Sequence, residues 1–248
     1  NHYGFNSPGA QEVAENLRQY KRDNIVIGIN IGKNKDIPDI ATLHLIAAVA
    51  DKLLEFASYF VINVSSPNTP GLRQLQSKEP LSKIIKAVRK VVDRTSKKPP
   101  IFVKISPDVK IKELNEIIET VINNKAQGII AANTTVEPAI KSYYGRRWEK
   151  EAGGLSGNDD QYRALTTKLV SHIYRQTNGK LSIIGVGGVH DTTTALEKLQ
   201  AGANAVQLVT AIKYEGLSIA NTINRGLLDW MDRNGVHSVQ EIIGSRSK

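Results

Sequence analysis

Short apolar runs, rich in β-branched residues, recur along this chain, and a stretch with helical spacing follows each of them. We expect six strands, at Ile25–Ile31, Tyr59–Val64, Ile101–Ile105, Gly128–Ala132, Ser182–Val186 and Ala205–Val209. We expect helices at Gln11–Lys21, Pro38–Phe56, Leu81–Thr95, Ile111–Asn123, Gln161–Gln176, Thr192–Ala201, Leu217–Asn234 and Val239–Ile243, and a long loop over Glu137–Asn158. Strands that alternate with helices favour a parallel sheet with right-handed crossover connections.

The length of 248 residues suits one α/β barrel or two smaller domains. No GxGxxG follows a strand and no Walker A sequence occurs, so the common nucleotide-binding folds are not indicated. Short strands with polar residues at their C-terminal ends favour the (β/α)8 TIM barrel. Six βα units are two short of eight, so either the sheet is open or the first two strands lie before Asn1. The abrupt start without Met favours the second, and we expect residues 1–248 to form a single barrel domain.

Composition excludes several classes of chemistry. The chain has no cysteine, which excludes disulfides, Cys–metal sites and Cys nucleophiles. Its five His residues lack ligand spacing, so we expect no metal site. The net charge of +9 suits an anionic ligand, an anionic membrane surface or nucleic acid, but Lys and Arg are spread along the chain, which favours a solvated surface. No apolar run reaches the ~18 residues of a membrane span, and no secretory signal is visible.

The densest polar cluster follows the second expected strand, in Val61–Gln76, which has the sequence VINVSSPNTPGLRQLQ. An apolar strand that runs into a polar loop rich in Pro and Gly is typical of a strand end that carries a site. The alternative is an ordinary turn, since Ser, Asn and Thr favour turns anyway.

Polar or glycine residues stand at the other expected strand ends too. They include Asn30, Lys104, Asn133, Thr134, the Gly187–Gly188 pair and Thr210. Several Asn amides, each with a donor and an acceptor, suit a flat heterocycle with amide-like edges. Lys104 suits an anionic ring or phosphate, although a strand-end Lys that reaches solvent is the plainer alternative. Glycines allow backbone N–H groups to approach a phosphate, and this barrel class binds phosphate at loops after its last strands.

Seven segments occur in one order from Asn1 to about Gly244: NHYGFNSPG, GINIGKNK, VINVSSPNTPGLRQLQ, FVKISPD, ANTT, GGLSG and IGVGGV. Together they closely resemble the class 2, quinone-linked dihydroorotate dehydrogenases. The resemblance implies an FMN-dependent (β/α)8 barrel that oxidises dihydroorotate to orotate in de novo pyrimidine biosynthesis. It also implies that the electrons then pass to a membrane quinone.

Ser66, the second serine of SSPN, matches the catalytic base of that family. The resemblance implies that it takes the C5 proton of dihydroorotate while a hydride leaves C6 for the flavin. Class 1 relatives have Cys there, so the absence of Cys agrees with class 2. A serine hydroxyl is a poor base and needs a nearby acceptor, a water or a dry site, and Thr69 and Phe5 match positions that would orient and screen such a water. The alternative for Ser66 is a hydroxyl that caps the turn.

The other implied contacts fall into two sets. The implied substrate-binding residues are Asn1, His2, Tyr3, Gly4, Phe5, Asn63, Asn68, Asn133 and Thr134. The implied FMN-binding residues are Asn30, Asn63, Lys104, Ala132, Ser156, Gly157, Gly187, Gly188, Val209 and Thr210. Three positions depart from the family, because His2 stands where Arg is common, Ala132 where Thr is common and Val209 where Tyr is common.

The largest departure is at the front of the chain. Ahead of the segment that matches Asn1–Phe5, the family carries two barrel strands, a flavin loop, a Lys that contacts orotate and a helical pair that forms the quinone tunnel. The implied partners are therefore dihydroorotate or orotate and a membrane quinone reached through an upstream segment, on this or a separate chain, and not nucleic acid. The implied location is peripheral on the mitochondrial inner membrane in a eukaryote, and otherwise the cytoplasmic face of the bacterial membrane.

Two competing functions stay open at this point. A barrel resembling the tRNA dihydrouridine synthases would suit the positive charge, but it should have a catalytic Cys, and the chain has none. A non-catalytic remnant that only holds ligand is the second competitor. The intact set of Ser66, Lys104 and Asn residues argues against a remnant, while the absence of the upstream strands leaves it open.

Overall fold

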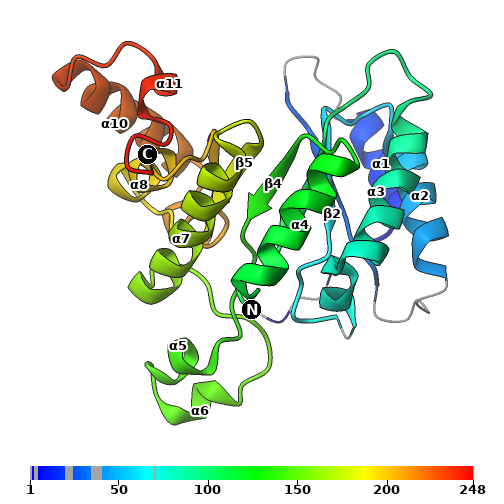
Figure 1. Cartoon of the computed structure of the whole chain (residues 1–248), viewed down its shortest axis with the longest axis horizontal. Helices are drawn as coiled ribbons and strands as arrows, with labels where there is room; N and C mark the ends of the chain where they lie inside the picture. The colour runs from blue at the N-terminus through cyan, green and yellow to red at the C-terminus, as the bar shows by residue number, and fades with distance from the viewer. Residues whose placement is uncertain (1, 3–4, 20–24, 35–40, 70, 248) are drawn as a thin grey trace. The chain divides into compact units, whose positions relative to one another are not determined.

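The structure is a computed structural model and describes residues 2, 5–19, 25–34, 41–69 and 71–247. The chain divides into two compact units, which Figure 1 shows in colours from blue to red along the chain. The N-terminal unit comprises His2–Ile105 and Lys110–Gly128, and the C-terminal unit comprises Ser106–Val109 and Ile129–Lys248. In the sheet the six strands follow the order of the sequence, from β1 to β6. This is the α/β arrangement that the alternating pattern predicts.

Three parallel strands form the sheet of the N-terminal unit: β1 (Gly28–Ile31), β2 (Tyr59–Asn63) and β3 (Ile101–Ile105). The register pairs Gly28 with Tyr59 and Asn63 with Lys104. Successive side chains of a strand point to opposite faces, so this register separates two rows of residues. One row is apolar and buried, and consists of Ile29, Ile31, Phe60, Ile62, Ile101, Val103 and Ile105.

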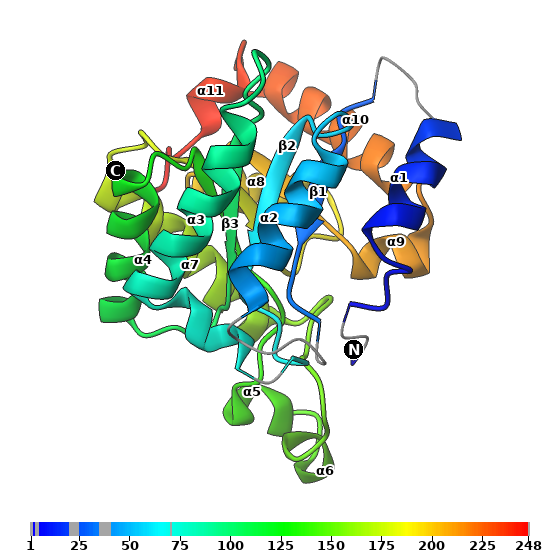
Figure 2. The same cartoon turned by 90° about the vertical axis from the view of Figure 1, so that its right-hand side faces the viewer.

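Helices α2 (Thr42–Leu53), α3 (Lys78–Val92) and α4 (Ile111–Asn123) cover one face of these strands (Figure 2). Each helix has apolar residues at spacings of three and four, such as Leu81, Ile85 and Val88 in α3, and these side chains are buried. Burying one such side chain stabilises the fold by ~1.5–3 kcal/mol. The unit also contains α1 (Ala10–Gln19) and the short 3-10 helix η2 (Leu72–Gln76).

In the C-terminal unit, β5 (Ser182–Val186) and β6 (Ala205–Gln207) are parallel, with Gly185 opposite Val206. Strand β4 (Gly128–Ala131) leads the chain into this unit. The remaining elements are α5 (Pro138–Ser142), α6 (Arg146–Glu149), α7 (Asp160–Thr177), α8 (Thr192–Gln200), α9 (Thr210–Glu215), α10 (Ile219–Arg233) and α11 (Val239–Ile242). Two apolar clusters, one around Ala195 and Ile223 and one around Leu199 and Met231, pack α8 against α10.

Aspartate side chains fix the starts of α7 and α8. Asp159 accepts a hydrogen bond from Tyr162 N at 2.5 Å, and Asp191 accepts one from Thr194 N at 2.8 Å. Both are N-cap residues that satisfy amides the helix leaves unpaired, which stabilises a helix by about 1 kcal/mol. The caps also fix where the glycine-containing loops before α7 and α8 end.

Several predicted boundaries are confirmed and several are wrong. The bounds predicted for β3, β5 and α4 are those observed. The first strand begins at Gly28 rather than Ile25, because Gly28 pairs with the first residue of β2 and the residues before it have no strand to join. Ile25 and Val26 are accordingly exposed, by 54% and 76%.

Three predictions in the C-terminal unit are also wrong. The predicted loop over Glu137–Asn158 contains α5 and α6, which lie side by side in Figures 1 and 2. The last strand ends at Gln207, and α9 begins at Thr210, where no helix was expected. These helices have only four to six residues, too few for an apolar stripe to show in the sequence.

Candidate active site

Asn30, Asn63 and Lys104 lie on the same face of the N-terminal sheet, opposite the apolar row. The register shows this, since Asn63 is the partner of Lys104, and Asn30 is the partner of Val61, two residues before Asn63. All three stand toward the C-terminal ends of their strands. The structure therefore brings together three of the residues expected to bind a cofactor.

Lys104 is the one cation in this group. It is half-buried, and burial lowers the pKa of its ammonium group because the charged form loses hydration. Within the described residues no carboxylate pairs with it. A desolvated, unpaired ammonium group is unfavourable unless an anion binds beside it, so the plainer alternative of a Lys side chain in open solvent does not describe this residue.

The Asn63 amide is held from one side by Ser65. Its Oδ1 accepts hydrogen bonds from Ser65 Oγ at 2.8 Å and from Ser65 N at 3.3 Å. Both side chains are buried. Because Oδ1 is occupied, Asn63 is left to offer its NH2 group as a donor. Ser65 thus orients Asn63, a role that sequence reasoning missed.

Ser66 lies in the turn that follows. Its Oγ accepts a hydrogen bond from Asn68 N at 3.2 Å, so the turn-capping role that was the alternative is present. A hydroxyl that accepts one bond keeps its own proton and a second lone pair. The capping role and a role in proton transfer are therefore compatible.

Two buried polar atoms of this loop lack a hydrogen-bond partner within the described residues: Asn68 Oδ1 and Thr69 Oγ1. Asn68 is 8% exposed and Thr69 is 3% exposed, so solvent satisfies neither well. Leaving such a group unpaired costs about 1–3 kcal/mol, and native proteins rarely do so. Asn68 Oδ1 is therefore an acceptor available to an N–H or O–H group of a ligand.

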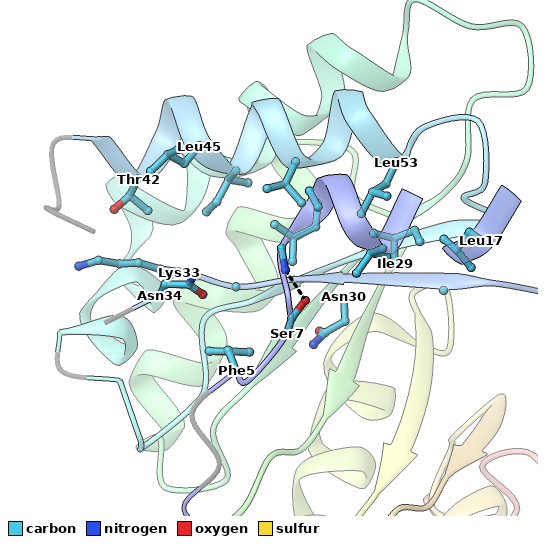
Figure 3. A pocket seen from close by; sticks show the side chains of 18 of the residues that line it. Phe5, Ser7, Leu17, Ile29, Asn30, Lys33, Asn34, Thr42, Leu45 and Leu53 are labelled. Atoms are coloured by element: carbon cyan, nitrogen blue, oxygen red, sulfur yellow. Dashed lines mark hydrogen bonds between the residues drawn. The ribbon is translucent and has the colours of Figure 1, made fainter. Parts of the chain in front are cut away.

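Phe5 lies over the loop that follows β1. A Cβ added at Gly32 would lie 2.5 Å from the Phe5 ring, so the ring packs directly on the glycine. Phe5 and Asn30 also line a cavity of about 410 Å³ between α1, β1 and α2 (Figure 3). Most of the remaining lining is aliphatic, with Lys33 and Asn34 at one end.

In the C-terminal unit, Asn133 and Thr134 follow β4. Asn133 Oδ1 accepts a hydrogen bond from Thr134 N at 2.8 Å, and Asn133 O accepts one from Tyr162 Oη at 2.9 Å. Tyr162 is buried, and that burial, with the nearby Asp108 carboxylate, raises its pKa, so the phenol stays a donor. Asp108 in turn accepts hydrogen bonds from Thr135 Oγ1 and Val136 N.

These bonds make Tyr162 and Asp108 supports of the Asn133–Thr134 segment, and sequence reasoning assigned neither. Asp108 belongs to the FVKISPD segment, which is the only signal in the sequence that pointed to it. No comparable signal pointed to Tyr162.

Ser156, Gly157 and Thr210 meet at a second point of this unit. Ser156 Oγ lies 3.1 Å from Thr210 Oγ1. Gly157 has φ of +100°, which L side chains rarely adopt, and a Cβ there would lie 3.0 Å from Thr210 Cγ2. The position therefore requires glycine both for its backbone and for its close approach to Thr210.

Gly187 and Gly188 form the turn after β5, with φ of +115° and +76°. A Cβ at Gly187 would lie 2.8 Å from Thr166, and one at Gly188 would lie 2.5 Å from Arg163 Cβ. Residues of α7 thus fill the space a side chain would need on that side, and the backbone is the group left to contact a ligand.

The remaining predicted residues have less defined surroundings. Ala132 is fully buried and its N–H donates to Val186 O at 3.1 Å. Val209 is 68% exposed, and His2 is exposed. Asn1, Tyr3 and Gly4 lie outside the described residues.

No group of three His, Cys, Asp or Glu residues in the described part of the chain is arranged to hold a metal ion. No described helix has the length and apolar character needed to cross a membrane.

Comparison with known proteins decides the family. The sequence profile described as dihydroorotate dehydrogenase matches residues 1–231. The chain belongs to the dihydroorotate dehydrogenase family. The resemblance drawn from the sequence motifs is thereby confirmed.

Individual members of the family agree with this assignment. The dihydroorotate dehydrogenase (quinone) of Christiangramia forsetii is 40% identical over 230 residues, which cover 92% of this chain and 65% of that protein. The enzyme of the same name from Trichodesmium erythraeum is 39% identical, and the match covers all of this chain and 66% of that protein. The chain therefore spans slightly less than two thirds of the length of these relatives.

The fold of the family is confirmed by solved structures. The crystal structure of Eimeria tenella DHODH in complex with ferulenol matches with a TM-score of 0.90 and 33% identity, over 100% of this chain and 71% of that one. The ligand-free enzyme from the same organism matches with a TM-score of 0.90 and 34% identity. The six βα units are thus part of the α/β barrel fold of dihydroorotate dehydrogenases.

Proposed function

We propose that this chain is the flavin- and substrate-binding part of a quinone-linked dihydroorotate dehydrogenase, which oxidises dihydroorotate to orotate. The observation that carries the proposal is the placement of Asn30, Asn63 and Lys104 on one face at the ends of adjacent strands. That the relatives named above are quinone-linked enzymes supports the reaction and the electron acceptor.

The residues present fit FMN as the cofactor. The half-buried Lys104, with no carboxylate beside it in the described residues, suits an anionic ring system. Asn30 and the Asn63 NH2 group supply hydrogen-bonding groups on the same face. FMN held there would supply the acceptor for the hydride that leaves C6 of dihydroorotate.

The phosphate of FMN would bind in the C-terminal unit. We propose that the backbone amides of the Gly187–Gly188 turn and the Gly157 loop cradle it, because glycine lets the backbone approach closely. Ser156 and Thr210, which contact each other, would add hydroxyl donors. Ala132 and Val209 would contribute backbone groups only, since their side chains lack donors.

Substrate contacts would come from Asn63, Asn68, Asn133 and Thr134, with His2 and Phe5 and the undescribed Asn1, Tyr3 and Gly4 completing the set. The unpaired Asn68 Oδ1 supports this assignment, because the ring N–H groups of dihydroorotate are donors that need acceptors. Ser65 and Tyr162 hold Asn63 and Asn133 in place, so less conformational freedom is lost when substrate binds.

Ser66 Oγ would take the C5 proton of dihydroorotate and pass its own proton to a water. The buried, unpaired Thr69 Oγ1 supports this route, since it is a group that such a water would satisfy. Phe5, packed on Gly32, would limit the access of bulk solvent. The quinone, and any contact with the bacterial or mitochondrial membrane where it resides, would involve an upstream segment of the kind that the family resemblance implies.

A steady-state assay tests the proposal. The purified protein is supplied with dihydroorotate and a soluble quinone, and orotate is measured. We expect orotate to form only when both substrates are present, and FMN to be the flavin released on denaturation. Orotate formation with NAD in place of quinone, or a different bound flavin, would refute the assignment.

A further inference from the structure

Two consecutive amides after β5 have no partner. Gly188 and Val189 are both buried, and the N–H of neither donates a hydrogen bond to an acceptor in the described part of the chain. Buried backbone N–H groups are almost always paired, because an unpaired one costs as much as a lost hydrogen bond. This pair therefore indicates a bound acceptor, and two successive N–H groups in a glycine turn suit an anionic oxygen group.

The direction of these N–H groups depends on the carbonyls that precede them. The peptide unit is planar and trans, so the C=O of one residue and the N–H of the next point in opposite directions. Holding the Gly188 carbonyl fixes the direction of the Val189 N–H. Holding the Gly187 carbonyl likewise fixes the Gly188 N–H.

His190 holds the first of these carbonyls. Its Nδ1 lies 2.8 Å from Gly188 O, which is a hydrogen bond when Nδ1 carries the proton. The residue is itself anchored, because His190 N donates to Thr194 Oγ1 at 3.0 Å in the first turn of α8. Its other ring nitrogen, Nε2, faces the Asp191 carboxylate at 3.7 Å. The backbone of His190 and its Nδ1 thus place the ring beside the Gly188 carbonyl.

Helix α7 lies against the second carbonyl. Thr166 Oγ1 lies 3.4 Å from Gly187 O and accepts a hydrogen bond from the buried Lys198 Nζ at 2.6 Å. Arg163 fills the space beside Gly188. Each of the two N–H groups therefore points away from the protein group that lies against the carbonyl before it.

We propose that His190 is a positioning residue, which holds the Gly188 carbonyl so that the Val189 and Gly188 N–H groups face the phosphate of a flavin mononucleotide. The inference rests on the proposed function for the identity of that anion. His190 does not contact the phosphate itself; it acts through the peptide between Gly188 and Val189.

The test compares two ligands that differ only in the phosphate. FMN and riboflavin are titrated separately into flavin-free protein, and dissociation constants are obtained from the quenching of flavin fluorescence. His190→Leu keeps a similar volume but removes the ring donor. His190→Asn places an amide near the position of Nδ1 and restores a donor. His237→Leu, at an exposed His in the same unit, is the matched control.

We expect His190→Leu to weaken FMN binding about tenfold, because the Val189 N–H is no longer held in place and its hydrogen bond to the charged phosphate is lost, and to leave riboflavin binding unchanged. His190→Asn should recover most of the loss, and His237→Leu should match the wild type. These effects on the FMN-to-riboflavin ratio would not arise from a purely structural role.

Two results would overturn the inference while leaving the proposed function intact. One is an unchanged preference for FMN over riboflavin in His190→Leu. The other is an equal loss of both ligands, which would mean general packing. A wild-type protein that binds riboflavin as tightly as FMN would refute the phosphate cradle itself, so a failure of the proposed function is recognisable as such.

Discussion

Ser66 and Ser65 are adjacent and differ only in what their hydroxyls do. Ser66→Ala removes the proposed base and the 3.2 Å hydrogen bond that Ser66 Oγ accepts from Asn68 N. General-base removal slows a reaction by about 10²–10⁴-fold, and one neutral hydrogen bond contributes about 0.5–1.5 kcal/mol to stability. For Ser66→Ala we expect flavin reduction to slow by about 10²–10⁴-fold and the unfolding free energy to fall by about 0.5–1.5 kcal/mol.

Ser65→Ala acts on the proposed site through Asn63. It removes the 2.8 Å bond from Ser65 Oγ to Asn63 Oδ1, while the 3.3 Å bond from Ser65 N remains. Losing one of two bonds that orient the amide is worth about 1 kcal/mol, or roughly fivefold in rate or binding. The two serines are therefore separated by at least an order of magnitude, although the Ser65 hydroxyl is the more deeply buried.

The assay is rapid mixing of each flavin-loaded variant with dihydroorotate under anaerobic conditions, with the loss of flavin absorbance followed over time. Ser82→Ala is the matched control, because its hydroxyl bonds Asn124 Oδ1 between α3 and the end of α4. Thermal unfolding of all the variants separates stability from chemistry. Equal rate losses for Ser65→Ala and Ser66→Ala would refute the assignment of the base.

Two further substitutions test other parts of the account. Gly157→Val should lower the amount of FMN retained on purification, because the valine side chain would meet Thr210 and block the proposed cradle. The control Gly145→Val lies at a glycine of similar φ with more open space and should retain FMN like the wild type. Equal FMN retention in both variants would exclude a cradle at Gly157. Burial lowers the pKa of Lys198 from 10.5 to about 7, so between these pH values the unfolded chain binds more protons than the folded one. The unfolding free energy should therefore rise from pH 7 to 10 more steeply in the wild type than in Lys198→Met. Parallel curves of unfolding free energy against pH, from denaturant titrations, would contradict this.

Parts of the fold could be predicted because they follow from local periodicity. Strands β3 and β5 and helix α4 have the predicted bounds, since each is a single apolar run or stripe bounded by polar residues. Parallel strands bring their C-terminal ends to the same edge of a sheet, and this explains why Asn30, Asn63 and Lys104 were found from sequence.

The rest depends on contacts between distant residues. Helices α5 and α6 are held by Lys141 Nζ, which donates to Glu151 O and Gly153 O, rather than by an apolar stripe of their own. The bond from Tyr162 to Asn133 joins residues 29 apart, and the one from Thr135 to Asp108 joins residues 27 apart. No pattern of residue spacing marks such pairs in advance.

The central claim is that this chain binds a flavin that dihydroorotate reduces. The most direct measurement is an anaerobic titration of the purified protein with dihydroorotate, with the visible flavin absorbance recorded after each addition. The account predicts that the absorbance bleaches in proportion to the dihydroorotate added and that orotate is formed in equal amount. A bound flavin that dithionite bleaches but dihydroorotate does not would contradict it.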